Sequence, residues 1–565
     1  MIRGLIYLEV CLFVISFAQV QTEWVKRYGP ANGSAGAKCV GVDAAGNIYI
    51  TGWSIESSST SRDYVTFKYN AQGNQIWKKV YNGPGNNNDE PFALYVDSAG
   101  NVYVTGESNG GFTTSQDIAT IKYNTNGTEL WVRRHTGTFN AGSDRGQAVI
   151  ADELGNVYVA GFAKNTVTGL DYATIKYSPG GNELWVREYC CTDSIDSDVA
   201  VSIALDATGN ILVTGYSDHL IGGGSSDEDY ATIKYNPDGD TLWVRRYDTS
   251  SQDEAMVIRT DNLQNIYVTG IGFGSGTGWD FLTIKYDSLG NEQWIRWHDY
   301  QGASDVPRDM AIDQWNNIII TGEGNWNSAA VDYVTIKYDI NGNECWARAY
   351  DDGGYDEAYG VAVDNYGNIY ISGMGSSTPP YYDDYLTTAY TKDGDTIWTI
   401  YYDQGVGDYD RAYDVACSHG TDDTVYIYVT GQSNDPTSIF WQYCTIKYKY
   451  KAPLVGLNEK VILYPNAESN NLQVHPNPFS EKTEIRSMMH DAGYGIKNFS
   501  LKIYDISGRI VNDLTNNFES CIMYHESNLC WSGDDAHGRR LPAGIYFVHQ
   551  EAGDYQQTEK VILLR

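Results

Sequence analysis

Residues 96–106 read Val-Asp-Ser-Ala-Gly-Asn-Val-Tyr-Val-Thr-Gly, and this pattern recurs eight times along the chain, the last copy in degraded form. The copies lie 51 to 58 residues apart. They end at Gly52, Gly106, Gly161, Gly215, Gly270, Gly322, Gly373 and Gly431. A Thr-x-Lys-Tyr segment follows seven of the copies, and Thr-Thr-Ala-Tyr at residues 387–390 replaces it once. A fixed period of this length is typical of a fold built from stacked repeats.

Each repeat contains four short runs with the alternation or β-branching of strands, separated by turn signals. In the second repeat these runs are residues 93–96, 102–106, 117–123 and 129–134. Four antiparallel strands in about 50 residues are what one blade of a β-propeller requires. The sequence therefore predicts an all-β chain with an eight-bladed β-propeller over residues 22–450.

The two ends of the repeat region indicate how the propeller closes. The first run of each repeat is small and apolar, which suits the centre, and the fourth carries a Trp with cations that would protect an outer edge. The last repeat stops after Tyr448 without a Trp run, whereas residues 23–28 form an orphan Trp run. We therefore predict that the N-terminal strand completes the last blade. The eight Trp runs are then those of Trp24, Trp77, Trp131, Trp185, Trp243, Trp294, Trp346 and Trp398.

These repeats resemble the SBBP-type β-propeller family, whose copies read much like VDxxGNxYVTG followed by DYxTIKY. The resemblance covers residues 22–450, and it implies a fold without implying a catalytic motif.

A different pattern follows a predicted linker at residues 451–471. It comprises Val-His-Pro-Asn-Pro-Phe at 474–479, an IYDISGR segment within 501–514, LPAGIYFV at 541–548 and KVILLR at the end. Short alternating strands of this kind predict an Ig-like β-sandwich over residues 472–565. The motifs resemble the C-terminal sorting domains of type IX secretion cargo, and equally the Ig-like module of hook-capping proteins. The first resemblance implies the outer-membrane secretion machinery as a partner and a secreted or surface location. An accessory module without a sorting role is the alternative.

The N-terminus and the charge agree with export. Arg3, the apolar residues 5–17 and small residues at 16 and 18 predict a signal peptide over residues 1–18, with a retained anchor as the alternative. No later stretch predicts a transmembrane segment. The formal charge of −33 argues against nucleic acid or anionic lipid as a partner. We expect a monomer.

The cysteines do not recur with the repeat, so the fold does not depend on a disulfide framework. Two pairs are disulfide candidates, Cys521 with Cys530 and the adjacent Cys190 with Cys191.

The turns after the first and third runs lie on one face of a propeller, so the longer connections lie on the other, where function is more common. Aromatic residues there could stack on sugars or grip a peptide, or could simply pack between loops. They are Trp53, Phe112, Trp279, Trp326, Tyr381, Tyr382 and Trp441.

Acidic residues recur before seven of the eight first strands on the same face, at Asp89, Asp144, Asp198, Asp253, Asp305, Asp356 and Asp410, and the first repeat has Gly36-Ala37 there instead. A ring of carboxylates could hold Ca²⁺. The alternative is that each caps a turn once per repeat. The Asp before each third strand and the repeated Lys, such as Asp63 and Lys68, are expected to be structural, the Lys in an internal ion-pair network.

The favoured hypothesis is a non-catalytic propeller that binds or displays a glycan or protein ligand without a cofactor, because no Ser-His-Asp pattern or metal-ligand spacing occurs. The rival is a propeller enzyme. A quinoprotein dehydrogenase would be eight-bladed, with a Gly-x-x-x-Trp feature like residues 127–131, and Cys190-Cys191 resembles the adjacent-cysteine disulfide of some of them. A glycan-active enzyme is the weaker form of this rival.

Overall fold

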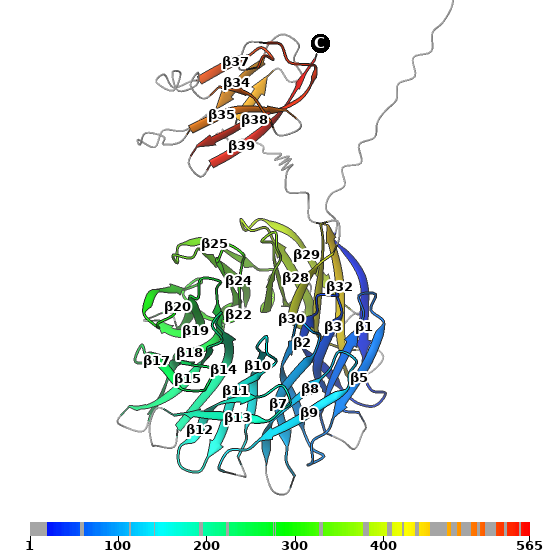
Figure 1. Cartoon of the computed structure of the whole chain (residues 1–565), viewed down its shortest axis with the longest axis vertical. Helices are drawn as coiled ribbons and strands as arrows, with labels where there is room; N and C mark the ends of the chain where they lie inside the picture. The colour runs from blue at the N-terminus through cyan, green and yellow to red at the C-terminus, as the bar shows by residue number, and fades with distance from the viewer. Residues whose placement is uncertain are drawn as a thin grey trace, which may run out of the picture. The chain divides into compact units, whose positions relative to one another are not determined.

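The computed structural model describes residues 20–56, 61–111, 115–139, 142–190, 196–221, 225–274, 276, 278–326, 331–376, 383–403, 409–420, 423–434, 440–451, 472–475, 483–487, 499–505, 509–514, 527–535, 539–552 and 555–564. These residues form the strands β1 to β39, and the chain divides into two compact units, residues 1–457 and 458–565 (Figure 1). Within the described ranges no helix has the length and apolar character needed to cross a bilayer. The predicted signal peptide lies outside the described residues.

The first unit repeats one succession of strands. The first strands of the repeats are β2 (Ala35–Val42), β6 (Asp89–Val96), β10 (Arg145–Ala151), β14 (Asp196–Leu205), β18 (Glu254–Thr260), β22 (Ser304–Ile312), β26 (Glu357–Val363) and β30 (Asp410–His419). The second strands are β3 (Ile48–Ser54), β7 (Val102–Asn109), β11 (Val157–Asn165), β15 (Ile211–Ile221), β19 (Ile266–Gly274), β23 (Ile318–Trp326), β27 (Ile369–Gly375) and β31 (Thr424–Asn434).

The third strands are β4 (Asp63–Tyr69), β8 (Gln116–Tyr123), β12 (Gly169–Tyr177), β16 (Ser225–Tyr235), β20 (Gly278–Tyr286), β24 (Asp332–Tyr338), β28 (Asp384–Tyr390) and β32 (Trp441–Lys451). The fourth are β5 (Gln75–Tyr81), β9 (Glu129–His135), β13 (Glu183–Tyr189), β17 (Thr241–Tyr247), β21 (Glu292–His298), β25 (Glu344–Tyr350) and β29 (Thr396–Tyr402). Strands of one repeat pair in chain order, as in β2-β3-β4-β5. A short parallel pairing of β12 with β14 joins two of these sheets.

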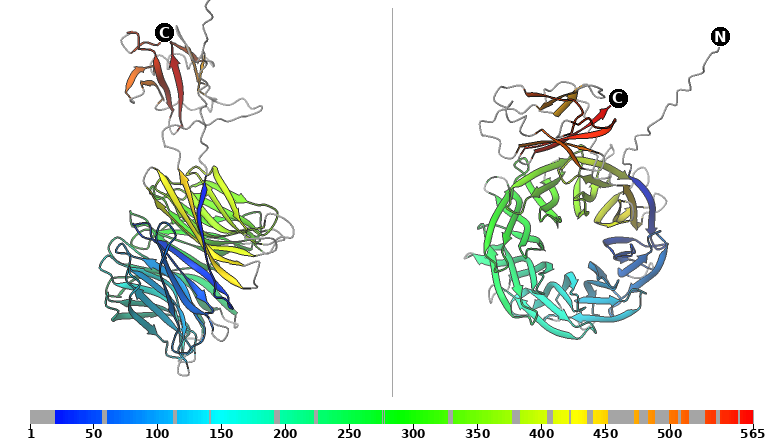
Figure 2. Two further views of the ribbon diagram at one scale, coloured as in Figure 1. Left: turned by 90° about the vertical axis from the view of Figure 1, so that its right-hand side faces the viewer. Right: turned by 45° about the horizontal axis from the view of Figure 1, so that its top comes forward.

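The sheet of the last repeat takes its fourth strand from the other end of the chain. Strand β1 (Gln21–Tyr28) pairs antiparallel with β32, with Trp24 opposite Lys447 and Tyr28 opposite Tyr443. This confirms the predicted pairing of the N-terminal Trp strand. The first strands contact one another in chain order, and the last of them, β30, contacts the first, β2. Small antiparallel sheets thus follow one another in a propeller-like arrangement (Figure 2).

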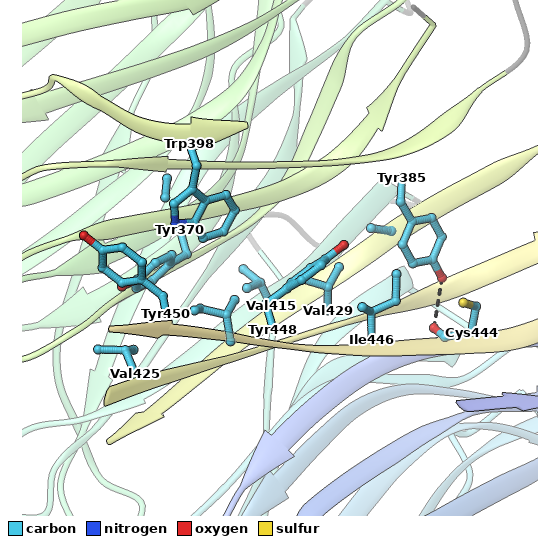
Figure 3. Close-up of a cluster of buried hydrophobic side chains, with 13 residues drawn as sticks. Tyr370, Tyr385, Trp398, Val415, Val425, Val429, Cys444, Ile446, Tyr448 and Tyr450 are labelled. Atoms are coloured by element: carbon cyan, nitrogen blue, oxygen red, sulfur yellow. Dashed lines mark hydrogen bonds between the residues drawn. The ribbon is translucent and has the colours of Figure 1, made fainter. Parts of the chain in front are cut away.

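The core of this unit lies between neighbouring sheets. Tyr370 and Trp398 of one sheet pack against Val415 and Tyr448 of the next (Figure 3). The second and third strands are covered on both faces, so β3 and β4 are buried along their whole length. This explains why these strands are nearly continuous apolar runs, whereas a strand with one face in water alternates.

Polar side chains also join each sheet to the next. Tyr172 donates its hydroxyl to the carbonyl of Ala231 at 3.0 Å, and Lys176 Nζ and Trp185 Nε1 both donate to the carbonyl of Pro237, at 2.7 and 3.1 Å. Arg187 Nε donates to the carbonyl of Gly239 at 2.6 Å. The cations on the fourth strand, predicted to protect the outer edge, therefore also bind the neighbouring sheet. The guanidinium of Arg187 satisfies a turn of the neighbouring sheet, and similar bonds recur along the repeats.

The repeated lysine has the partners expected of a buried cation. Lys68 donates to the carbonyl and hydroxyl oxygens of Thr125, at 3.0 and 2.8 Å. Carboxylate partners occur too: Lys234 with Asp206 at 2.8 Å and Lys337 with Asp313 at 2.9 Å, all nearly out of solvent. Each repeated lysine therefore donates to a backbone carbonyl of the neighbouring sheet, and some of them also form an ion pair.

The C-terminal unit contains two sheets. One is ordered β33-β34-β37 and the other β36-β35-β38-β39. Trp531 of the first packs against Leu501, Tyr546 and Val548 of the second, and its indole Nε1 donates to the carbonyl of Asp534 at 2.9 Å. The strands are β33 (Leu472–His475), β34 (Thr483–Ser487), β35 (Phe499–Asp505), β36 (Ile510–Asp513), β37 (Ser527–Trp531), β38 (Gly544–Ala552) and β39 (Tyr555–Leu563).

Candidate functional site

The short turns on one face are held by a repeated set of internal hydrogen bonds. Asp43 Oδ1 accepts from the backbone N–H of Ala45 and Asn47, at 3.0 and 2.8 Å. Asp43 Oδ2 accepts from the amide of Asn47 and the hydroxyl of Tyr49, at 2.8 and 2.9 Å. Gly46 has φ +75°, which explains the glycine in the motif. The hydrogen bond from the backbone N–H of the Asn to the Asp carboxylate recurs in the equivalent turns, at Asp97, Asp152, Asp206, Asp261, Asp313 and Asp364. The repeated motif is therefore structural.

The opposite face, which we call the loop face, consists of the connections between second and third strands and the crossings between sheets. These connections differ from repeat to repeat: β15 and β16 extend to eleven residues each, whereas β3 and β4 have seven. Variable connections on a regular scaffold are where binding residues are usually found. The candidate site is therefore on the loop face.

The predicted aromatic residues do not form an exposed ring where they are described. Trp53 is only 8% exposed, because the guanidinium of Arg62 lies 4.1 Å above its ring and is held there by Glu90. Trp279 and Trp441 are half-buried. Phe112, Tyr381, Tyr382 and the side chain of Trp326 lie outside the described residues. Trp53 therefore fits the alternative in which these rings pack between loops.

Other aromatic side chains, which the sequence argument missed, are exposed in these connections. Phe139, Tyr355 and Tyr409 lie in crossings, and Phe273 lies near the end of β19. Their exposed fractions are 42%, 48%, 39% and 44%. Each lies in a connection that varies between repeats, so no repeated motif marks it. Only a comparison of the crossings with one another could have identified these residues from the sequence.

The seven predicted carboxylates before the first strands are all buried, with exposures of 0 to 1%. Asp89 accepts from the backbone N–H of Gly83 in the crossing, at 2.6 Å, and from that of Asn109 at the end of β7, at 2.9 Å. Asp144 accepts in the same way from Gly137 and Lys164, at 2.9 and 2.6 Å. These carboxylates hold a crossing to a neighbouring loop, in the manner of the turn-capping alternative.

Four of the seven also meet two further aspartates, one in the first half of the preceding third strand and one just after the preceding fourth strand. In each group one oxygen from every member lies within 4.8 Å of the others. The groups are Asp229, Asp248 and Asp253; Asp280, Asp299 and Asp305; Asp332, Asp351 and Asp356; and Asp384, Asp403 and Asp410. Sequence reasoning missed the middle member. Its signal is an Asp directly after a Tyr or His that ends the fourth strand, as in Tyr350-Asp351.

Cys190 lies in the crossing after β13 and is half-buried. It lines a shallow cavity of about 390 Å³ together with Thr138, Asn165, Asp171 and Glu188. Cys191 and Cys521 lie outside the described residues, and Cys530 is described only as part of β37. Both proposed disulfides therefore stay predictions.

Two family models match the chain. Residues 81–113 match the β-propeller repeat called SBBP, and residues 473–564 match the secretion system C-terminal sorting domain. An uncharacterised WD repeat-containing protein of Acanthamoeba polyphaga mimivirus is 23% identical over 430 residues, which is 64% of this chain. The chain spans only about a quarter of that relative, 26%.

Among solved structures, a catalytically inactive virginiamycin B lyase from Staphylococcus aureus is 13% identical, with 62% of this chain and 96% of that chain covered and a TM-score of 0.35. PorZ, a surface component of the type IX secretion system of Porphyromonas gingivalis, is 11% identical, with 94% and 81% covered and a TM-score of 0.29. The β-propeller domain of the trilobed protease from Pyrococcus furiosus is 9% identical, with 65% and 94% covered and a TM-score of 0.37.

Proposed function

We propose that this chain, which carries an SBBP β-propeller repeat and a type IX secretion sorting domain, is a non-catalytic binding or scaffold protein that works outside the cell. The sorting domain indicates export to the extracellular space or the cell surface. We further propose that the first unit is an eight-bladed propeller and the sorting domain an Ig-like sandwich. The successive contacts of the first strands and the two-sheet order of the C-terminal unit support this.

The single observation that carries the binding role is the difference between the two faces. The turn face repeats one hydrogen-bonded turn, whereas the connections of the loop face differ from repeat to repeat and expose Phe139, Phe273, Tyr355 and Tyr409. Exposed aromatic rings stack on sugar faces and bury well against a protein partner. We propose that the loop face binds a glycan or a protein through these rings.

The direct test is a glycan array and a pull-down with the purified chain without its predicted signal peptide. Replacing Tyr355 and Tyr409 by Ala should weaken binding at least tenfold. Trp315, which is 48% exposed in a turn-face loop, is the matched control, and Trp315→Ala should leave binding unchanged. Equal loss in both variants, or no ligand at all, would refute the role of the loop face.

Export is tested separately. Deleting residues 473–565 should retain the chain inside a bacterium that has type IX secretion, while the full chain reaches the surface or the medium. Secretion of the truncated chain at the normal level would refute a sorting role for residues 473–565.

The enzyme alternative has one supporting observation, the shallow cavity beside Cys190. A quinoprotein loaded with pyrroloquinoline quinone and Ca²⁺ would oxidise an added alcohol or aldose and pass the electrons to an artificial acceptor. We expect no reduction and no change in absorbance.

A further inference from the structure

Three carboxylates meet where the sheet of β24 and β25 joins that of β26. Asp332 begins β24, Asp351 directly follows β25 and Asp356 directly precedes β26. The backbone N–H of Asp356 donates to the carbonyl of Val331 at 2.7 Å, and this bond brings the two strand ends together. One oxygen from each of the three carboxylates lies within 4.8 Å of the others.

Two of these carboxylates are buried with an unsatisfied oxygen. Asp332 is 3% exposed and Asp356 is 0% exposed. Oδ1 of each is out of solvent and receives no hydrogen bond from any described residue. The rest of each carboxylate has partners: Asp356 accepts from the backbone N–H of Asp352, at 3.1 Å, and from that of Ser376, and Asp332 is hydrogen-bonded to Tyr300. A buried carboxylate that keeps one unsatisfied oxygen and has no counter-charge is unfavourable.

No cationic side chain compensates this group. Across the described ranges, no lysine, arginine or histidine forms an ion pair with Asp332, Asp351 or Asp356. Burial, together with the neighbouring charge of Asp352, raises the pKa of Asp356 to about 8. The group therefore requires a positive charge, either as protons or as a bound cation.

An equivalent group elsewhere shows what such compensation looks like. Asp229 lies in the corresponding place two sheets earlier, and Arg246 of the adjacent strand β17 forms an ion pair with it. Arg246 is paired with Ala231 in its sheet, and the residue in the same register of β25 is Ala349, which pairs with Val334. The position of the compensating guanidinium therefore carries only a methyl group beside Asp332.

We propose that Asp332, Asp351 and Asp356 bind a hard divalent cation, best matched by Ca²⁺. All the side-chain donors are carboxylate oxygens, which Ca²⁺ prefers, and its six to eight ligands are completed by water and carbonyl oxygen. The exposed Asp351 gives the ion a path from solvent. The seven predicted carboxylates thus act within their own sheet junctions and not as one ring around a channel.

The first test measures calcium uptake by the full chain after chelator treatment, using equilibrium dialysis against ⁴⁵Ca²⁺ at pH 7.5. The chain should bind Ca²⁺ and unfold at a higher temperature when Ca²⁺ is present. Asp351→Asn removes an exposed ligand, so it should fold and bind about one ion fewer, or bind that ion at least tenfold more weakly. Asp393→Asn is the control, because Asp393 is an exposed turn residue paired only with Lys392, and it should leave the stoichiometry unchanged.

The second variant copies the arginine of the compensated group. Ala349→Arg should supply the missing charge, so it should raise the stability of the calcium-free chain and abolish one calcium site. Absence of calcium uptake by the full chain at millimolar concentration would overturn the proposal. Full stoichiometry in both Asp351→Asn and Ala349→Arg would overturn it as well. Infrared absorption of protonated carboxyl groups at pH 7.5, without calcium uptake, would show that protons supply the charge instead.

Discussion

The hydroxyl of Tyr443 donates a hydrogen bond to the carbonyl oxygen of Val65 at 2.9 Å, and both residues are buried. Tyr443 belongs to the last repeat and Val65 to the first. The same bond joins neighbouring repeats elsewhere, from Tyr333 to Leu386 at 3.1 Å. Lys447 and Trp24 add donors to the carbonyl of Ala71, as their equivalents do in other sheets. The last sheet therefore meets the first through the same bonds that join sheets adjacent in sequence.

Removing this hydroxyl should lower stability as much at the junction of the chain ends as inside the repeat series. Tyr443→Phe and Tyr333→Phe each remove one buried hydrogen bond, which contributes about 0.5–1.5 kcal/mol. Thermal unfolding monitored by circular dichroism measures both. A clear shift for Tyr333→Phe with none for Tyr443→Phe would show that the junction of the ends is open in solution.

Deleting residues 20–28 should expose the edge of β32 and lower the unfolding temperature by several degrees, because an unpaired strand edge is left. A synthetic peptide of residues 20–29 added in trans should bind the truncated chain and restore much of the loss. The same peptide with Val25→Pro is the control. Val25 pairs with Ile446, and a proline there removes a ladder donor. Equal rescue by both peptides would contradict the strand pairing.

Gly181→Ala should destabilise the chain by about 1–3 kcal/mol, since the new methyl group would occupy a left-handed backbone position. Gly181 has φ +80°, and a Cβ there would lie 2.7 Å from Cγ of Trp131 in the neighbouring sheet. The adjacent Gly180 is a matched control, because a Cβ there would meet no atom within 4 Å. Urea unfolding of the two variants should separate them, and a similar effect of both would argue against the contact between Trp131 and this turn.

Lys234→Met should destabilise the chain by about 3–5 kcal/mol at pH 7, because it leaves Asp206 buried without its counter-charge. The ion pair Lys392–Asp393 is exposed, with side-chain exposures of 53% and 68%. Lys392→Met should therefore change stability by only about 0–1 kcal/mol. Chemical denaturation at pH 7 tests the difference, and equal effects would refute a structural role for the buried pair.

The ion pair of Lys234 and Asp206 also predicts that the free energy of unfolding falls at low pH. Burial alone would raise the pKa of Asp206, but hydrogen bonds from Lys234, Asn210 and Thr208 outweigh it and lower the pKa to about 2 from 3.8. The folded state thus favours the charged form, so this stabilisation is present above pH 4 and is lost as the pH falls toward 2. The difference between wild type and Lys234→Met should shrink over that range. A difference that stays constant from pH 7 to pH 2 would contradict this origin.

The repeat pattern was sufficient to predict the four strands of each sheet and the pairing of Trp24 with the last repeat. Local alternation and turn residues determine the strands, and the missing Trp run after Tyr448 required a partner from elsewhere in the chain. The hydrogen bonds between sheets were harder to predict from the sequence. The acceptor of Lys176 is the carbonyl of Pro237 in another repeat, and a carbonyl leaves no mark in the sequence.

The loop face was predicted least well, for reasons that particular residues make clear. The sequence could not decide whether Trp53 stacks on a ligand or packs between loops, because nothing in it indicates that Arg62 lies over the ring. Asp356 reads as part of a ring of seven because the repeat aligns it with Asp305 and Asp410. Its grouping with Asp332 and Asp351 depends on the close approach of two strand ends. Repeat alignment identifies equivalent residues and does not identify neighbours.

The pairing of β1 with β32 also sets an order of events in time. A ribosome makes residues 21–28 before the other strands of the first unit, yet their partner strand is complete only after residue 451 has been made. Throughout that interval β1 is unpaired, and the sheet that it completes has not formed. Such a delay between synthesis and pairing is long in sequence terms, so final assembly should be slow and the unfinished chain prone to aggregation. A cell that exports this protein must therefore protect its first strand until nearly the last repeat has arrived.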